Sequence, residues 1–276
     1  MAMAAGSITD FYYDAMHQLR RQNFKQGESI MNIYKEFAKV YDIFMAEVPY
    51  NTWADYIDEV LKQNKRDSKL ILELGCGTGS ITTLMKEKGY DMIGVDISED
   101  MLMIAKDKDE NILYLNQDMR EFELFGTVDA CICLCDSLNY ILEEKEILQI
   151  FKLVNNYLNP DGLFIFDINT KHKFQNILGD NSYCQAEENS AYIWENYYDE
   201  DAEINEYYTN IFVKEKNNLY QRHEEFHYQR AYTEEVLKDL ITQSGMELLQ
   251  IYEGFTFNTP TPASERLVFI TKEKGK

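Results

Sequence analysis

Glycines recur at every second position directly after a short apolar segment, and an acidic residue stands just before them. The segment 70–74 contains Glu73, and Gly75, Gly77 and Gly79 follow it. Because glycine has no Cβ atom, such a turn lets a ligand approach the backbone closely. A helix that begins after the turn attracts negative charge to its N-terminus. The sequence therefore predicts a ligand-binding turn between a strand and a helix, against the alternative of a turn that only joins the two.

Three classes of ligand are bound by turns of this kind. A mononucleotide phosphate loop needs a lysine after its last glycine, but Ser80 and Ile81 stand there. A dinucleotide site uses the spacing G-x-G-x-x-G, which is one residue longer than the spacing in this chain. The third ligand, S-adenosylmethionine, carries a positively charged amino acid head and a sulfonium. An acid at the end of the first strand, such as Glu73, complements that charge.

Two further acids follow the next two predicted strands. Asp96 ends the strand 91–96, where a carboxylate accepts hydrogen bonds from ribose hydroxyls. Asp118 follows the strand 112–115, where its carboxylate can accept from an adenine amino group while the Met119 backbone meets the ring. Ligands of open α/β sheets bind at the carboxyl ends of the strands. We therefore expect all three acids to share one site.

The elements that must position these residues alternate between strand and helix from Lys69 onward. The strands are almost continuously apolar, as in parallel βαβ units whose sheet is covered on both faces. The pattern predicts strands at 70–74, 91–96, 112–115, 128–134, 163–167, 246–252 and 266–271. It predicts helices at 33–45, 53–63, 80–88, 145–158 and 234–244, and another that begins near Ser98. An interruption rich in tyrosine and acids reads as three further strands at 192–198, 204–216 and 219–232.

Several of these motifs occur together in one known family. The chain resembles class I S-adenosylmethionine-dependent methyltransferases in Glu73–Gly79, Gly94–Ser98, Gln117–Met119 and Leu158–Gly162. Phe37–Asp42 and Cys135–Tyr140 resemble a bacterial small-molecule branch of the family, which is similar to aminosugar N-methyltransferases. The resemblance covers the chain from about residue 31 to its end.

The resemblance implies an α/β fold with a Rossmann-like seven-stranded sheet whose last strand is antiparallel. S-adenosylmethionine would be the methyl donor and S-adenosylhomocysteine the product. We expect residues 31–182 and 233–276 to form the cofactor-binding domain and 183–232 to form an inserted antiparallel β lid over the substrate. Residues 1–30 would be an N-terminal extension, either a tag or fusion segment or a docking helix for a partner or for the chain itself. The expected cofactor-binding residues are Tyr41, Glu73, Gly75, Cys76, Gly77, Gly79, Asp96, Ile97, Asp118, Met119 and Cys135.

The predicted lid supplies two candidate catalytic residues and no metal site. His223 and His227 are four residues apart, but on a strand that spacing spans about 13 Å, which is too far to chelate one ion. His227 is a candidate base, because an unperturbed histidine pKa of about 6.5 suits proton transfer. Arg230, on the opposite strand face, is a candidate contact for a substrate carboxylate or phosphate. The alternative for Arg230 is a surface salt bridge.

The charge balance restricts the partners. The chain has 27 basic and 48 acidic residues, a formal net charge of −21. Such a field repels nucleic acid and anionic lipid, so we expect no nucleic-acid partner, and an acceptor that is neutral or cationic. No apolar run approaches the roughly 18 residues that cross a membrane. No secretory signal is recognisable, and the cysteines of segment 131–135 alternate like core residues, so a cytoplasmic location is expected.

The main functional hypothesis is transfer of a methyl group to a nitrogen or oxygen of a small molecule. A second hypothesis is a non-catalytic sensor or scaffold that binds S-adenosylmethionine and docks a partner through the N-terminal helix. A third is a methyltransferase that acts on tRNA or protein, and the acidic surface disfavours the RNA version. A nicotinamide oxidoreductase is opposed by the tight glycine spacing.

Overall fold

The computed structural model describes residues 38–65 and 67–276. The expected N-terminal extension, 1–30, lies outside the described residues, as does the first part of the helix predicted at 33–45. The described part of that helix is α2 (Ala38–Phe44). In the described residues, no helix is long and apolar enough to cross a membrane.

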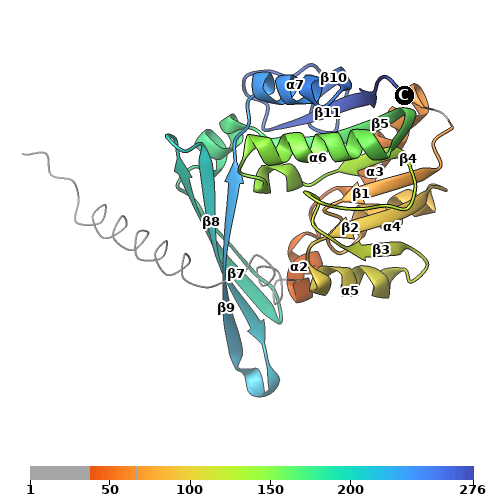
Figure 1. Cartoon of the computed structure of the whole chain (residues 1–276). Coiled ribbons are helices and arrows are strands. Elements are labelled where there is room, and N and C mark those ends of the chain that lie inside the picture. Colours follow the sequence, from red (N-terminus) through yellow and green to blue (C-terminus); the bar gives the residue numbers. More distant parts are fainter. Residues whose placement is uncertain (1–37, 66) are drawn as a thin grey trace, which may run out of the picture. The chain divides into compact units, whose positions relative to one another are not determined.

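Seven strands form one sheet, in the order β10-β11-β5-β4-β1-β2-β3 (Figure 1). Strand β11 runs antiparallel to both of its neighbours, and the other adjacent pairs are parallel. This order confirms the predicted seven-stranded sheet with an antiparallel last strand. The bounds are β1 (Leu70–Leu74), β2 (Asp91–Asp96), β3 (Leu113–Asn116), β4 (Val128–Cys133), β5 (Leu158–Asn169), β10 (Met246–Glu253) and β11 (Arg266–Glu273).

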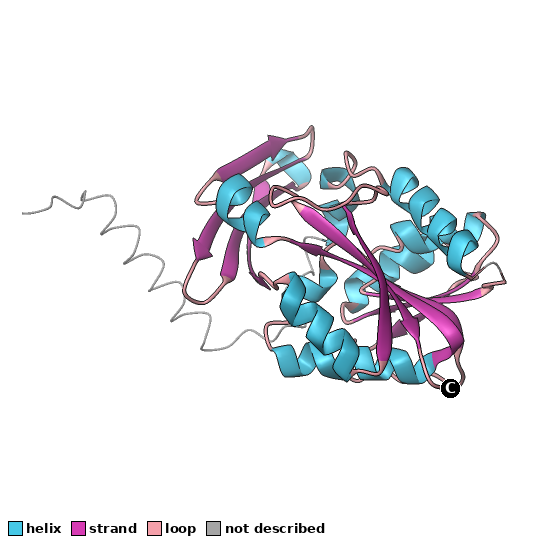
Figure 2. Cartoon of the chain, turned by 90° about the horizontal axis from the view of Figure 1, so that it is seen from above, coloured by secondary structure: helices cyan, strands magenta, loops and turns pink. Residues whose placement is uncertain are grey.

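Helices cover both faces of this sheet (Figure 2). They are α3 (Tyr50–Asn64), α4 (Ser80–Glu87), α5 (Glu99–Lys108), α6 (Glu144–Tyr157) and α7 (Glu234–Gln243). In β1, Leu72 packs in the core on the side of α6 and α7, whereas Ile71 packs with α3, α4 and α5. Successive strand residues point to opposite faces. Because both faces of β1 are buried, its sequence is apolar almost throughout.

A separate sheet of four antiparallel strands follows β5. Its strands are β6 (Ser182–Ala186), β7 (Ser190–Asp199), β8 (Ile204–Lys214) and β9 (Tyr220–Arg230). Three of them were predicted, but β6 was missed. This edge strand is short, and its side chains are only exposed or half-buried, so it lacks the apolar alternation that marks a strand. The predicted division of the chain into domains stays a prediction.

The side chain of Asn139 ties the two sheets together. Its Nδ2 donates to the backbone oxygens of Asn169, at the end of β5 (3.1 Å), and of Arg230, at the end of β9 (2.8 Å). Its Oδ1 accepts from the Asn169 N–H (2.9 Å). Because Asn139 is fully buried, these bonds fix where the four-stranded sheet joins the seven-stranded sheet.

Candidate functional site

The glycine turn after β1 adopts a conformation that favours glycine. Gly75, Gly77 and Gly79 have φ angles of 68°, 52° and 74°, in the left-handed region. A Cβ atom on Gly75 would lie 2.7 Å from the Ser137 Oγ, so the turn packs directly against the segment after β4. Among residues 38–65 and 67–276, its two chain neighbours apart, no atom lies within 4 Å of the Cβ position of Gly77. The turn therefore has open space on one side, as a ligand approaching its backbone requires.

Glu73 lies beneath this turn and is almost completely buried. Its carboxylate accepts a short hydrogen bond from the Thr82 hydroxyl of α4. Burial, together with the nearby charge of Asp96, raises the Glu73 pKa to about 8, although the Thr82 bond opposes this. A buried acid with this pKa suits a site that receives a positively charged group. The arrangement fits the ammonium of S-adenosylmethionine.

A change of Glu73 to Gln is expected to alter how stability depends on pH. Burial favours the neutral form of Glu73, so the stabilisation associated with its raised pKa is lost as pH rises through about 8. Between about pH 7 and about pH 9 the free energy of unfolding of the wild type should fall by about 1.4 kcal/mol more than that of the Gln variant. Urea unfolding at both pH values measures this difference. An equal fall in the free energy of unfolding of the two proteins would contradict the prediction. The control is Asp91→Asn, at an exposed carboxyl, which should show the same pH dependence as the wild type.

Asp96 and Asp118 stand at the ends of neighbouring strands, as predicted. Asp96 accepts from the N–H groups of Gly77 (2.8 Å) and Ser98 (2.8 Å), so it ties the glycine turn to the start of α5. Burial raises the pKa of the Asp96 carboxyl in opposition to these two donors. Ile97, between Asp96 and Ser98, accepts from Asn116 through its backbone oxygen (2.9 Å).

Asp118 has a partner that the sequence did not suggest. Arg120 donates to both of its carboxylate oxygens and also reaches Glu146 of α6 (3.2 Å). Although burial alone would raise it, these bonds hold the pKa of the Asp118 carboxyl below its usual range. The Met119 side chain lies beside the Gly75 backbone. Asp118 is thus an ionised acceptor held in one orientation.

Helix α2 is bonded to the glycine turn through Asp42. The Thr78 hydroxyl donates to Asp42 Oδ1 (2.6 Å), and Lys108 of α5 pairs with Asp42 Oδ2 (2.7 Å). Tyr41 is hydrogen-bonded to Tyr50 and lies near Cys135, and burial raises its pKa well above the usual value. The structure therefore brings Tyr41 and Cys135 together, at the end of β4 beside the turn. Cys76, within the turn, is buried.

The chain bends sharply after β4. Cys135 and Asp136 have φ angles of 57° and 52°, which non-glycine residues adopt only under strain of about 1–3 kcal/mol each. The Asp136 N–H donates to Asp167 Oδ2 (3.1 Å), and the Ser137 hydroxyl donates to the Leu134 oxygen (2.7 Å). Strained backbone that its surroundings hold in place is typical of functional sites.

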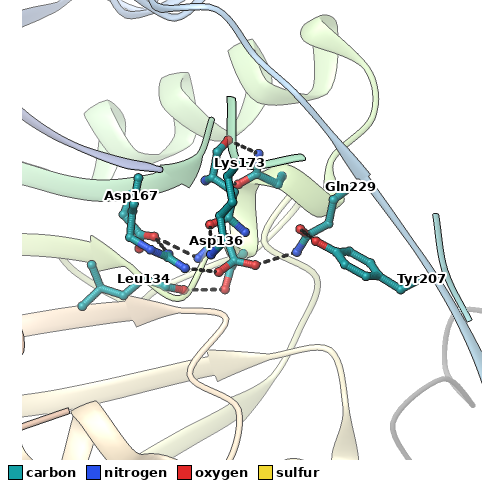
Figure 3. A network of polar contacts seen from close by, with 10 residues as sticks. Leu134, Asp136, Asp167, Lys173, Tyr207 and Gln229 are labelled. Atoms are coloured by element: carbon teal, nitrogen blue, oxygen red, sulfur yellow. Dashed lines mark hydrogen bonds and ion pairs between the residues drawn. The ribbon is translucent and has the colours of Figure 1, made fainter. Parts of the chain in front are cut away.

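Asp136 is the centre of a network that crosses between the two sheets (Figure 3). Arg266 of β11 pairs with Asp136 Oδ1 (2.7 Å) and with the fully buried Asp167 at the end of β5. From the four-stranded sheet, Gln229 of β9 donates to Asp136 Oδ2 (2.6 Å) and accepts from the Tyr207 hydroxyl (2.6 Å). This chain of bonds places β9 against the ends of β4 and β5.

Arg266, Asp167 and Gln229 were not predicted as site residues from the sequence. The available signal was position: Asp167 ends one predicted apolar strand and Arg266 begins another. In an antiparallel pair these two ends lie at the same edge of the sheet, and Asp167 is opposite Val268 in the register.

The two predicted catalytic residues lie on opposite faces of β9. His227 is buried, contacts Glu225 through Nε2 (3.2 Å) and packs edge-on against the Tyr140 ring. Arg230 donates to the Leu142 oxygen (2.9 Å) and pairs with Glu144 (2.8 Å). These contacts favour the salt-bridge alternative for Arg230, which fastens β9 to the start of α6. No group of three or more potential ligands for a metal ion occurs in the part that the structure describes.

Comparisons with known proteins identify methyltransferases as relatives of this chain. A family model described as a methyltransferase domain matches residues 71–162. A protein of Geobacillus sp. named as a methyltransferase is 36% identical over 87% of this chain and 99% of its own length. The crystal structure of an S-adenosylmethionine-dependent methyltransferase from Clostridium acetobutylicum has a TM-score of 0.79 and 30% identity, covering 88% of this chain and 100% of that one. A dTDP-3-amino-3,4,6-trideoxy-α-D-glucopyranose N,N-dimethyltransferase of Streptomyces venezuelae is 27% identical over 48% of this chain and 56% of its own length.

Proposed function

Since the chain belongs to the class I S-adenosylmethionine-dependent methyltransferases, we propose that it methylates a nitrogen or oxygen of a small-molecule acceptor. The observation that carries the proposal is the network around Asp136. Asp136 follows the end of β4, which lies next to β1 in the sheet, and the segment after it packs on Gly75. A methyl donor on the turn and an acceptor at the network would therefore be neighbours.

The cofactor would be held by residues of four strand ends. Glu73 would face its ammonium, the glycines its amino acid portion, Asp96 the ribose hydroxyls and Asp118 the adenine amino group. Ile97 and Met119 would contact the adenosine, and Cys76, Tyr41 and Cys135 would line the site. When bound, S-adenosylmethionine supplies a methyl group already activated by its sulfonium, so the protein mainly contributes proximity, alignment and exclusion of water.

The network favours an acceptor that is neutral or cationic. Asp136 and Asp167 place two carboxylates at the proposed acceptor side, and Arg266 is already engaged by both. A phosphate or carboxylate would have to displace one of these bonds. The Streptomyces venezuelae relative is named for a dTDP-linked amino sugar; its amine supports a nitrogen acceptor here, whereas its diphosphate would need a place away from this network. His227, buried on the strand that also carries Gln229, is a candidate base for a nitrogen acceptor.

All five cysteines are free thiols, which fits the cytoplasmic location expected from the sequence.

The acceptor class is tested by measuring S-adenosylhomocysteine formation with pairs of matched compounds. Glucosamine is compared with glucose, and phenethylamine with phenethyl alcohol, each with the full chain and S-adenosylmethionine. We expect product with at least one amine above the rate without acceptor, and less with its hydroxyl partner. A faster reaction with the hydroxyl compounds would assign oxygen as the acceptor atom. Rates equal to the acceptor-free background throughout would contradict the proposal.

A further inference from the structure

Lys173 begins an unusual helical turn directly beyond the end of β5. The segment Lys173–Leu178 is a π-helix, η3, and the Gly179 N–H donates to the Phe174 oxygen (2.7 Å), five residues back. Such turns are rare and often occur at functional sites. The turn places Lys173 at the carboxyl end of a parallel strand, on the edge of the sheet where α/β proteins bind ligands.

The Lys173 ammonium is half-buried among charged groups. Its Nζ donates to Asn169 Oδ1 (3.0 Å), and within residues 38–65 and 67–276 it forms no ion pair. The charge of Arg266 of β11 acts on it, as do the charges of Asp136, Asp167 and Glu265. Burial lowers the Lys173 pKa and the Arg266 charge adds to that, while the three acids oppose it.

We propose that Lys173, in place of His227, is the general base that accepts a proton from the nucleophile of the acceptor, since His227 Nε2 already contacts Glu225 (3.2 Å); this rests on the proposed function. For an amine that arrives as an ammonium ion, one N–H bond on the acceptor breaks and one forms at Nζ. The electron pair left on the acceptor nitrogen becomes its nucleophilic lone pair. Lys173 is then a positively charged ammonium, which returns the proton to water after the reaction. No oxidant or further reactant is needed.

The neighbouring groups are less suited to this role. Arg266 stays protonated in proteins, so it cannot accept a proton. Asp136 and Asp167 are both paired with Arg266, so an acceptor would have to break an ion pair to reach either carboxylate. Lysine next to another cation is a recognised way to obtain a neutral amine near neutral pH. Figure 3 shows Lys173 and Asp136 within the same network.

The first test needs no acceptor. The full chain is acetylated with trace acetic anhydride across a range of pH, and the reaction of each lysine is followed by peptide mass spectrometry. Exposed Lys106 of α5 is the internal reference. Partial burial slows Lys173 at every pH, but the midpoint of its titration reports only the fraction of neutral amine. We expect a midpoint at lower pH than that of Lys106, and an equal or higher midpoint would overturn the proposal.

The second test separates a base from a structural charge. The variants Lys173→Arg and Lys173→Met are compared with Lys106→Met, using whichever of glucosamine and phenethylamine reacts faster with the wild type. Arginine keeps the charge and the hydrogen-bond donors but cannot accept a proton. Both Lys173 variants should lose about 100-fold in kcat with a smaller change in KM, and Lys106→Met should not. Wild-type kcat and an unchanged pH profile in Lys173→Arg would overturn the proposal. Calorimetric binding of S-adenosylmethionine reports separately on the proposed function, since it does not depend on Lys173 being a base.

Discussion

Replacing Arg266 with methionine is expected to destabilise the protein by about 3–5 kcal/mol, because it leaves two carboxylates without their cation. Asp167 is fully buried, and Arg266 is the cation that pairs with both Asp167 and Asp136. Burial raises the pKa of Asp167 even with the guanidinium present, so its ionised form is already disfavoured. Without Arg266, Asp167 must either take up a proton or stay charged in the interior. Urea denaturation at neutral pH measures the loss.

Two controls make this prediction specific. Lys272→Met, on the same strand, removes an exposed pair with Asp161 (3.2 Å) and should cost less than about 1 kcal/mol. The double variant Arg266→Met with Asp167→Asn should recover part of the loss, because the buried charge is removed together with its partner. If the free energy of unfolding of Arg266→Met lay within about 1 kcal/mol of the wild-type value, the ion pairs of Arg266 would not hold the two strand ends together.

Replacing Asp96 with alanine is expected to weaken binding of S-adenosylmethionine by at least about 100-fold. The proposed site uses this carboxylate to accept two ribose hydroxyls, and hydrogen bonds to a charged group contribute about 1.5–3 kcal/mol each. Two such bonds amount to about 3 kcal/mol or more, which corresponds to the stated loss of affinity. The carboxylate also holds the Gly77 N–H (2.8 Å), so its loss loosens the turn as well. Isothermal calorimetry of the full chain measures the change.

The matched control is Asp91→Ala, at the exposed start of the same strand. It removes an identical side chain and should leave the affinity for S-adenosylmethionine unchanged. Asp96→Asn separates charge from shape, because the amide retains the size of the carboxylate and one acceptor oxygen. We expect its affinity to lie between those of the wild type and Asp96→Ala. Equal affinity in the wild type and Asp96→Ala would refute the assignment of Asp96 to the ribose.

The parts of the fold that follow from neighbouring residues were predictable. Each of the strands β1, β2 and β3 has a short apolar pattern and ends near an acid, and the glycine turn is visible in five consecutive letters. The strand at 266–271 followed from its apolar pattern, but the antiparallel direction of β11 came from the family resemblance. Strand β6 was missed because an edge strand with half-exposed side chains needs no apolar alternation.

The network at the proposed acceptor side depends on contacts between distant residues. Arg266 is 130 residues from Asp136 in sequence, and Gln229 is 93 residues from it. No local pattern encodes such a pair, because each side chain alone reads as an ordinary charged or polar residue. The alternation on β9 correctly placed His227 and Arg230 on opposite faces. It could not show that Arg230 pairs with Glu144, which lies on another element.

The central claim, methyl transfer within this site, is tested most directly in a single turnover. The full chain is loaded with S-adenosylmethionine that carries a labelled methyl group, freed of unbound cofactor and mixed with glucosamine or phenethylamine. Mass spectrometry then follows the label. The account predicts that the label appears on the acceptor nitrogen while an equal amount of bound S-adenosylhomocysteine forms. Label that stays on tightly bound S-adenosylmethionine with both amines and with their hydroxyl partners would contradict it, and would favour a sensor or scaffold instead.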